Sequence, residues 1–307
     1  MFLKTKAVGL EIANEGAAIA LVGKRRGLPV LERCETVTFP AGALKLSLKE
    51  PNIVDRPLVA GQLRELYARL LTGQKQVSLS LPDAAGRVML LDLETRLKSK
   101  EEGADLIRWK LKKNLPIDIS EIHLDYQILR ERESGELSAL VALISRSVIS
   151  QYEELVCEIG LEPIRVDFTT FNLVRLFLKM VGGESTAVVL WYKGVISILI
   201  FHDGILEFFR AKEIFEGSFE TNRIFRELNS SFLVYRDKVS GQKLQRVLFY
   251  SPPWDREALQ SLLTDVTGVT PHMIDLSRSC VGQSENPASD ATLHVYLAAV
   301  GAAARTF

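Results

Sequence analysis

The order of apolar and polar residues near the amino terminus predicts three β-strands separated by tight turns. Apolar residues alternate with polar or small ones, and the runs stop at ANEG and KRRGLP, which are rich in turn-forming residues. The expected strands cover residues 6–12, 16–23 and 29–39. They form a three-stranded meander, and Gly16 is expected to supply a positive φ in its first turn.

The same arrangement returns in the second half of the chain. Three strand-like runs are divided at Lys193-Gly194 and at Asp203-Gly204. They cover residues 185–193, 194–201 and 204–212. The two meanders lie about 180 residues apart, and helices and further strands follow each of them. This repeated order predicts two related lobes that face one another across a cleft.

Apolar residues at helical spacing predict helices between these strands. One begins near Asp55 and has Gly73 just past its end, a second begins at Ser99, and a third runs into Gly160 as its C-terminal cap. Ser99 and Glu102 have the spacing of a capping box. A longer amphipathic helix in the second half is expected to bury Phe225, Leu228, Phe232, Tyr235 and Val239.

These elements predict an α/β protein of two lobes, with an extra α+β subdomain inserted in the first. The expected division is residues 1–86, completed by 163–184 and the last helix 290–307, for the first lobe, 87–162 for the inserted subdomain, and 185–289 for the second lobe. The clearest loop is SENPAS, residues 284–289. No low-complexity linker separates the lobes.

The composition narrows the functional classes mainly by exclusion. Of 307 residues, 47% are hydrophobic, which is enough for a large core. Lys plus Arg and Asp plus Glu both number 38, so the formal net charge is zero. Nucleic-acid binding that depends on an overall positive charge is therefore not expected. No segment reaches the roughly 18–20 apolar residues that cross a bilayer, so we expect a chain that is neither secreted nor membrane-inserted by itself.

The cysteine, histidine and tryptophan residues do not have the spacing of a known catalytic or metal-binding motif. The cysteines lie far apart, which favours free, buried thiols in a reducing compartment. The histidines lack metal spacing and are interpreted as surface or strand residues, and the tryptophans as core residues. The basic side of the helix around Trp109 leaves open a contact with an acidic partner or lipid headgroups. The residues concerned are Cys34, Cys157, Cys280, His123, His202, His272, His294, Trp109, Trp191 and Trp254.

Four stretches of the chain carry a family resemblance. They are AVGLEIA, DLIRWKLKKNLPIDISEIHLDYQIL, SQYEELVCEIGLEPIRVDFTTFNLVRLF and HVYLAAVGAAAR. With the order of strands, they resemble the PilM family of type IV pilus assembly proteins and the related cytoplasmic domain of the type II secretion protein GspL. The resemblance covers nearly the whole chain. It implies an actin-like fold of duplicated ribonuclease-H-like lobes, in the variant of the cell-division protein FtsA, with the α+β insert in the first lobe.

The resemblance also implies three nucleotide-contacting places, and the chain departs from the family pattern at each. The first hairpin should read Asp-Ile-Gly, but Glu11 and Ala13 stand at the acidic and glycine positions. The second loop should begin with Asp, but Trp191 stands there before Gly194, and an indole cannot hold a metal or its waters as a carboxylate does. The later Gly-Gly turn falls at residues 251–253, SPP, where proline fixes φ and removes an amide.

The resemblance and these departures together predict a non-catalytic scaffold with no cofactor and no metal, on the cytoplasmic side of the bacterial inner membrane. What the resemblance implies is an adaptor that takes the cytoplasmic tail of a membrane partner in a groove by the insert, or meets the assembly ATPase as GspL does. Membrane association would then run through partners, and the choice between pilus and secretion machine stays open.

One alternative of another class remains open from the residues: an ATP-binding actin-like protein with an atypical site. That site would use Glu11, Asn14, Gly16, Lys193 and Gly194. A sugar or acid kinase on the same fold is disfavoured, because Asp203, which has a glycine beside it between two expected strands, is explained better by turn geometry than by acid catalysis. The familiar Walker, GxGxxG, GxSxG and HExxH patterns are absent.

Overall fold

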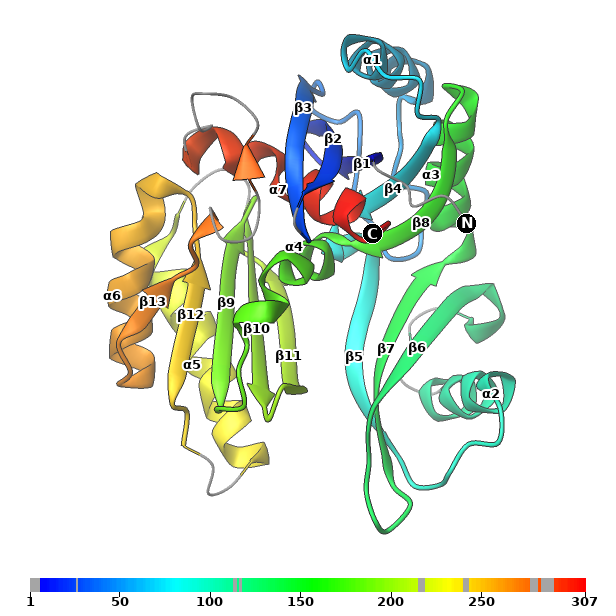
Figure 1. Ribbon diagram of the computed structural model, residues 1–307. Coiled ribbons are helices and arrows are strands. Elements are labelled where there is room, and N and C mark those ends of the chain that lie inside the picture. Colours follow the sequence, from blue (N-terminus) through cyan, green and yellow to red (C-terminus); the bar gives the residue numbers. More distant parts are fainter. Residues whose placement is uncertain are drawn as a thin grey trace. The chain divides into compact units, whose positions relative to one another are not determined.

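The chain divides into two compact units, each described here by itself (Figure 1). Unit 1 consists of Met1–Asn172 and Tyr296–Phe307, and unit 2 of Leu173–Val295. The chain passes from one unit to the other inside helix α4 (Thr169–Phe177) and again inside helix α7 (Asp290–Ala304). The computed structural model describes residues 6–25, 27–112, 115, 118–214, 219–239, 243–276, 281–282 and 290–307. The expected loop at residues 284–289 lies outside these ranges, and the lobe boundaries stay a prediction.

Unit 1 is built on a sheet in which β3, β2, β1, β4 and β8 lie side by side in that order (Figure 1). The first three strands form the expected antiparallel meander, and β4 and β8 continue the sheet in parallel with β1. The bounds are β1 (Lys6–Ala13), β2 (Gly16–Arg25), β3 (Leu28–Thr38), α1 (Arg56–Arg69), β4 (Gln76–Leu81), α3 (Arg146–Glu158) and β8 (Glu162–Phe168).

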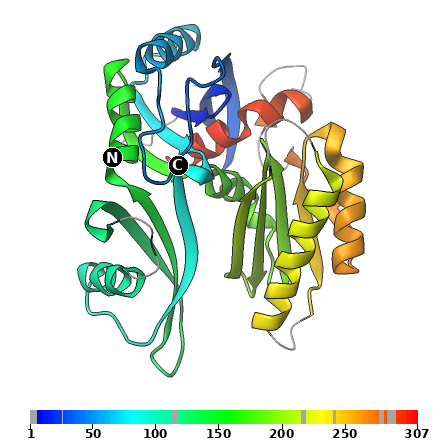
Figure 2. The same cartoon turned by 180° about the vertical axis from the view of Figure 1, so that it is seen from behind.

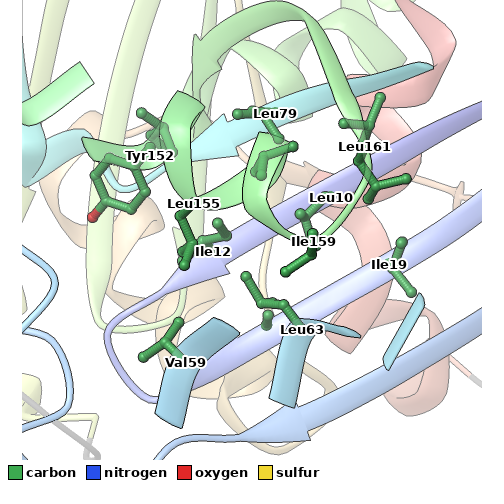
Figure 3. Close-up of a cluster of buried hydrophobic side chains, with 14 of the residues drawn as sticks. Leu10, Ile12, Ile19, Val59, Leu63, Leu79, Tyr152, Leu155, Ile159 and Leu161 are labelled. Carbon is green, nitrogen blue, oxygen red and sulfur yellow. The ribbon is translucent and has the colours of Figure 1, made fainter. Parts of the chain in front are cut away.

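Helices cover both faces of this sheet because β1 is buried on both. On one face, Leu10 and Ile12 pack with Leu63 of α1 and Leu155 of α3 in a single apolar cluster (Figure 3). On the other face, Gly9 lies directly against the backbone of Ala299 in α7. Only glycine permits this approach, since a methyl group at residue 9 would overlap the carbonyl oxygen of Ala299.

A second, three-stranded sheet with order β5-β7-β6 belongs to the segment between β4 and α3 (Figure 1). Helix α2 covers one of its faces, with Ile107 and Leu111 packed on the strands. Ser99 caps α2 as expected, since its hydroxyl accepts a hydrogen bond from the Glu102 amide at 3.2 Å. The bounds are β5 (Gly86–Leu93), α2 (Lys100–Leu111), β6 (Ile122–Glu131) and β7 (Leu137–Ser145).

Unit 2 repeats the meander in a sheet of order β11-β10-β9-β12-β13. Helices α5 and α6 pack on the face that carries Ala187, Val189 and Trp191, and Figure 2 shows α5, in yellow, lying across the sheet. The bounds are β9 (Thr186–Tyr192), β10 (Val195–His202), β11 (Ile205–Glu213), α5 (Thr221–Lys238), β12 (Arg246–Tyr250), α6 (Arg256–Thr267), β13 (Pro271–Met273) and β14 (Val281–Gly282).

Both turns predicted in this second meander have the expected conformation. Lys193 and Gly194 have φ values of 46° and 76°, and Asp203 and Gly204 have 49° and 74°. Two successive positive φ values are typical of the primed turns whose twist matches a hairpin.

Two expectations about turns and caps are wrong. Gly16 does not have a positive φ; it is needed because the backbone of β3 at Val37 lies where a side chain would be. Helix α1 ends at Arg69, and the left-handed residue after it is Leu71 rather than Gly73. Gly160 does have a positive φ of 85°, which confirms it as the cap of α3.

Two expectations about burial are also wrong. Helix α5 buries Ile224 and leaves Phe225 39% exposed, so its apolar face begins one residue earlier than predicted. Cys34 is half-buried and Cys157 exposed, although both are free as expected. Cys280 lies outside the described residues.

The close approach of α7 to β1 leads to a stability prediction. We expect Gly9→Ala to lower the free energy of unfolding by about 1–3 kcal/mol, because the helix must move away from the strand. Gly61→Ala is the matched control, since no atom lies within 4 Å of its added methyl group. In the middle of α1 it should raise the same free energy by about 0.5–1 kcal/mol. Urea unfolding of both variants measures this, and equal effects would contradict the packing argument.

Candidate functional site

A groove of about 310 Å³ lies in unit 1, where the smaller sheet meets α3 and β8. Its walls come from β6 and β7 on one side and from α3 and β8 on the other. Half-buried apolar side chains make up much of the lining, and charged ones stand among them. The lining residues are His123, Asp125, Ala142, Leu143, Ile144, Ile149, Glu153 and Pro163 to Phe168.

The groove follows the open edge of β8. All six consecutive residues from Pro163 to Phe168 line it, although neighbouring strand residues point to opposite faces of a sheet. A cavity that touches both kinds of residue runs along the strand's edge. Among the described strands, only β4 pairs with β8, so the other edge of β8 carries backbone groups that no neighbouring strand pairs.

A bulge shapes this edge near its start. Val77 of β4 lies opposite Pro163, and the next residue, Ser78, lies opposite Arg165. Ile164 is therefore an extra residue in the ladder, which breaks the regular alternation. The bulge accounts for an apolar side chain of β8 in the lining beside the proline.

Two of the acidic residues in the groove are neutralised by cations of unit 1. The Asp125 carboxylate lies 2.8 Å from the Lys100 ammonium, and the Asp167 carboxylate 2.7 Å from the Arg305 guanidinium. Burial raises the pKa of Asp167, and the charge of Arg305 opposes that rise. The third acid, Glu153, is half-buried and makes no hydrogen bond or ion pair with the described residues.

Arg305 connects the groove to the end of α7. Besides Asp167, its guanidinium donates to the Asn172 side chain at 3.0 Å and to the Phe171 carbonyl at 3.4 Å. Gly301 holds α7 close enough for these bonds, since a methyl group there would overlap the carbonyl oxygen of Asn172. The arginine thus joins β8, α4 and α7 within unit 1.

The candidate nucleotide residues divide between the two units. Glu11, Asn14 and Gly16 lie together on the β1–β2 hairpin of unit 1. The Glu11 side chain is 1% exposed and lies on the face of β1 that α7 covers, opposite Ala18 and Ser80. The hairpin therefore presents a buried carboxylate where the family pattern has a phosphate-loop aspartate.

Lys193 and Gly194 lie in the β9–β10 turn of unit 2. The Lys193 ammonium stands 5.3 Å from the centre of the Tyr192 ring. Trp191, where the family's second aspartate would stand, is buried in the core, and its indole nitrogen donates to the Asp255 carboxylate at 2.8 Å. This position has a structural contact in place of a metal-binding carboxylate.

An aromatic cluster around His294 was missed by the sequence analysis. His294 is 7% exposed in α7, not a surface or strand residue, and its Nδ1 lies 2.8 Å from the Tyr250 hydroxyl. The rings of Tyr192 and Trp254 lie 4.9 and 5.7 Å from it. Burial, with a smaller effect of the Lys193 charge, lowers its pKa to about 4, so the imidazole is neutral at pH 7. His294 and Tyr192 lie far in the sequence from each other and from Tyr250 and Trp254, so no local pattern predicts the cluster.

The expectation that the three tryptophans are core residues is confirmed for one of them and wrong for the other two. Trp191 is a core residue, but Trp109 and Trp254 are 75% and 67% exposed. Near Trp109, Arg108 pairs with Asp105 at 3.0 Å and Lys110 donates to the Asp92 carbonyl at 2.5 Å. These two cations of the basic helix side therefore have partners within the chain.

A second acid, Asp83, was also missed, and it is half-buried. It follows β4, and one of its oxygens accepts a hydrogen bond from the Thr170 amide at the start of α4, at 3.2 Å. Burial raises its pKa to about 7. The only sequence signal is an aspartate directly after the strand-ending Leu-Pro.

No group of His, Cys, Asp or Glu within the described residues could hold a metal ion. None of the described helices is long and apolar enough to cross a membrane.

Comparison with known proteins places the chain in a family. The profile of the type IV pilus assembly protein PilM matches residues 9–233. The chain belongs to this family. Curated protein sequences gave no match.

Solved structures establish the fold of this PilM-family chain. A PilM-PilN type IV pilus biogenesis complex matches with a TM-score of 0.82 and 17% identity, over 99% of both chains. A Bacteroides thetaiotaomicron protein with an actin-like ATPase fold matches with a TM-score of 0.54 and 14% identity, over 88% of this chain and 91% of that one. The cytoplasmic domain of EpsL, from the type II secretion system of Vibrio cholerae, matches with 0.51 and 9%, over 80% and 82%. The fold is actin-like, as expected.

The buried histidine of this PilM-family chain gives a pH prediction. An imidazole with its ordinary pKa of 6.5 when unfolded and about 4 when folded binds protons preferentially in the unfolded state between those values. This group therefore makes the free energy of unfolding fall as the pH drops from 6.5 to 4, by up to about 3 kcal/mol.

Urea unfolding at several pH values tests this prediction. The His294→Phe variant should lose that part of the pH dependence. His272→Gln, at an exposed histidine, should keep it. An unchanged slope in His294→Phe would show that His294 is not buried in its neutral form.

Proposed function

We propose that this PilM-family chain is a non-catalytic adaptor of an inner-membrane assembly platform, and that its groove holds an extended cytoplasmic segment of a membrane protein. The platform is that of a type IV pilus, in line with the family, and the adaptor works on the cytoplasmic side of the membrane. The observation that carries the proposal is the groove along the open edge of β8.

Strand addition is the binding mode that suits this groove. An extended segment entering it can pair its backbone with the open edge of β8, and can place alternate side chains against the apolar lining. Ile149, Ile164 and Val166 offer half-buried apolar contacts for such side chains. A helix has a diameter of about 10–12 Å with its side chains and leaves no backbone groups for the edge to pair.

The comparisons supply the kind of partner. PilM is assembled with PilN in the solved type IV pilus biogenesis complex, to which the chain is similar over 99% of its length. We extend that pairing to this chain and propose a PilN-type membrane protein as the occupant. The assembly ATPase, a second partner implied by the GspL resemblance, stays a prediction.

Site-specific crosslinking in cells tests the adaptor. A photoreactive benzoylphenylalanine at the position of Ile164, inside the groove, should form a covalent adduct with the PilN-type protein. The same residue at the position of Leu233, which is 47% exposed on α5, is the control and should form none. Equal adducts at both positions, or none at Ile164 from a folded protein, would contradict the proposal.

We further propose that the chain works without ATP. In its support, Glu11 is buried within unit 1, and Trp191 is engaged with Asp255 in unit 2. Titration calorimetry with Mg-ATP up to about 1 mM, where even roughly −4 kcal/mol of binding is measurable, should give no saturable heat. Saturable heat that Lys193→Ala abolishes would instead establish the atypical nucleotide site.

A further inference from the structure

Glu153 differs from the other acidic residues of the groove. It follows Ile149 by one helical turn on α3, so both side chains lie on the same face and line the groove. Asp125 and Asp167 have Lys100 and Arg305 as their cations, whereas Glu153 has no partner among the residues that the structure describes. It is also half-buried, so its carboxylate has already lost part of its water.

The next residue of α3, Glu154, serves as a comparison, because its carboxylate pairs with a cation of the chain. Glu154 points away from the groove, where its side chain is 62% exposed and pairs with Arg56 at 3.1 Å. Glu158, one turn later, pairs with the same arginine at 3.0 Å. The acids of α3 outside the groove therefore have a cation from the chain itself, and the one inside does not.

The arginine of the lining, Arg165, is exposed and makes no ion pair with Glu153, so an occupant that covers Glu153 must itself compensate the charge. A segment that lies over Glu153 removes more of its water, and a desolvated carboxylate without a donor is costly. A basic group on the segment restores the balance with a charge-assisted hydrogen bond. A neutral segment of the same shape leaves the charge unpaired and is rejected.

We propose that Glu153 is a specificity-determining residue, and that the groove selects an extended segment which places a Lys or Arg side chain, or a free amino terminus, against it. The inference rests on the proposed function, because it needs a segment in the groove. The apolar lining sets the remaining requirement, namely apolar side chains on either side of the basic group.

A randomised decapeptide library displayed on phage is the probe. Peptides selected by the wild-type protein should be enriched in Lys or Arg at one position, flanked by apolar residues. Selection by Glu153→Gln should lose that enrichment. Selection by Glu154→Gln, which removes a neighbouring charge on the same helix, should keep it. Far-ultraviolet circular dichroism and thermal melting confirm that both variants are folded.

A double-mutant cycle makes the test quantitative. With a synthetic peptide selected by the wild-type protein, we expect Glu153→Gln to weaken binding about tenfold, and replacement of the peptide's basic residue by norleucine to weaken it equally. Together the two changes should cost no more than either alone. Additive losses, or unchanged enrichment with Glu153→Gln, would overturn the inference.

A groove-filling variant separates this inference from the proposed function. Ile164→Lys should abolish binding of the selected peptides, which shows that they occupy the groove. If the wild-type protein selects no peptide that this variant releases, the proposed function fails. If it selects groove-dependent peptides without a preferred basic residue, only the role of Glu153 is wrong.

Discussion

The close backbone contact of α7 with its neighbours is the constraint on which unit 1 depends. At Gly9 of β1 a side chain would collide with the backbone of α7, and at Gly301 of α7 a side chain would collide with the backbone of Asn172 in α4. The buried residues of α7 near Gly301 are small, so the helix lies close to the sheet. They are Ala298, Ala299, Ala302 and Ala303. This spacing brings Arg305, one residue beyond α7, within 2.7 Å of Asp167 in the groove. The geometry of the groove therefore depends on glycine and alanine residues, which have no functional groups in their side chains.

The sequence predicts the local features of the fold well, because their causes lie close together in the chain. The two meanders follow from period-two alternation and from turn residues such as Lys193-Gly194, whose φ values fit the predicted turn. The cap of α2 at Ser99 likewise needs only residues three apart. Gly16 was explained wrongly for the opposite reason. Glycine is required at this position because the backbone of Val37 in β3 lies beside it. A rule based on turn residues cannot predict a contact with a strand so far along the chain.

The candidate site was predictable only in outline. The family resemblance implied a groove near the insert, but no pattern distinguished Glu153 from Glu154. The two residues are identical and adjacent, and they differ only in what the folded chain places beside them. The same holds for His294, whose neighbours Tyr192 and Tyr250 come from strands far away in the sequence. Features that depend on tertiary contacts of this kind need the structure.

The residues at the family's phosphate positions have structural surroundings in this chain. Glu11 is enclosed within the unit 1 sheet, and Trp191 is packed in the unit 2 core with its nitrogen bonded to Asp255. Side chains buried in this way contribute to folding, and replacing them affects stability before it affects any ligand.

The open edge of β8 also bears on contacts between copies of the chain. An unpaired edge is a template on which other chains can add indiscriminately, and proteins protect such edges with proline, charge and bulges. All three occur here within a few residues, as Pro163, the exposed Arg165 and the bulge at Ile164. A regular strand cannot form a continuous ladder of hydrogen bonds along this edge, because the proline and the bulge interrupt it. These three features therefore make regular strand pairing between copies of the chain unfavourable at this edge.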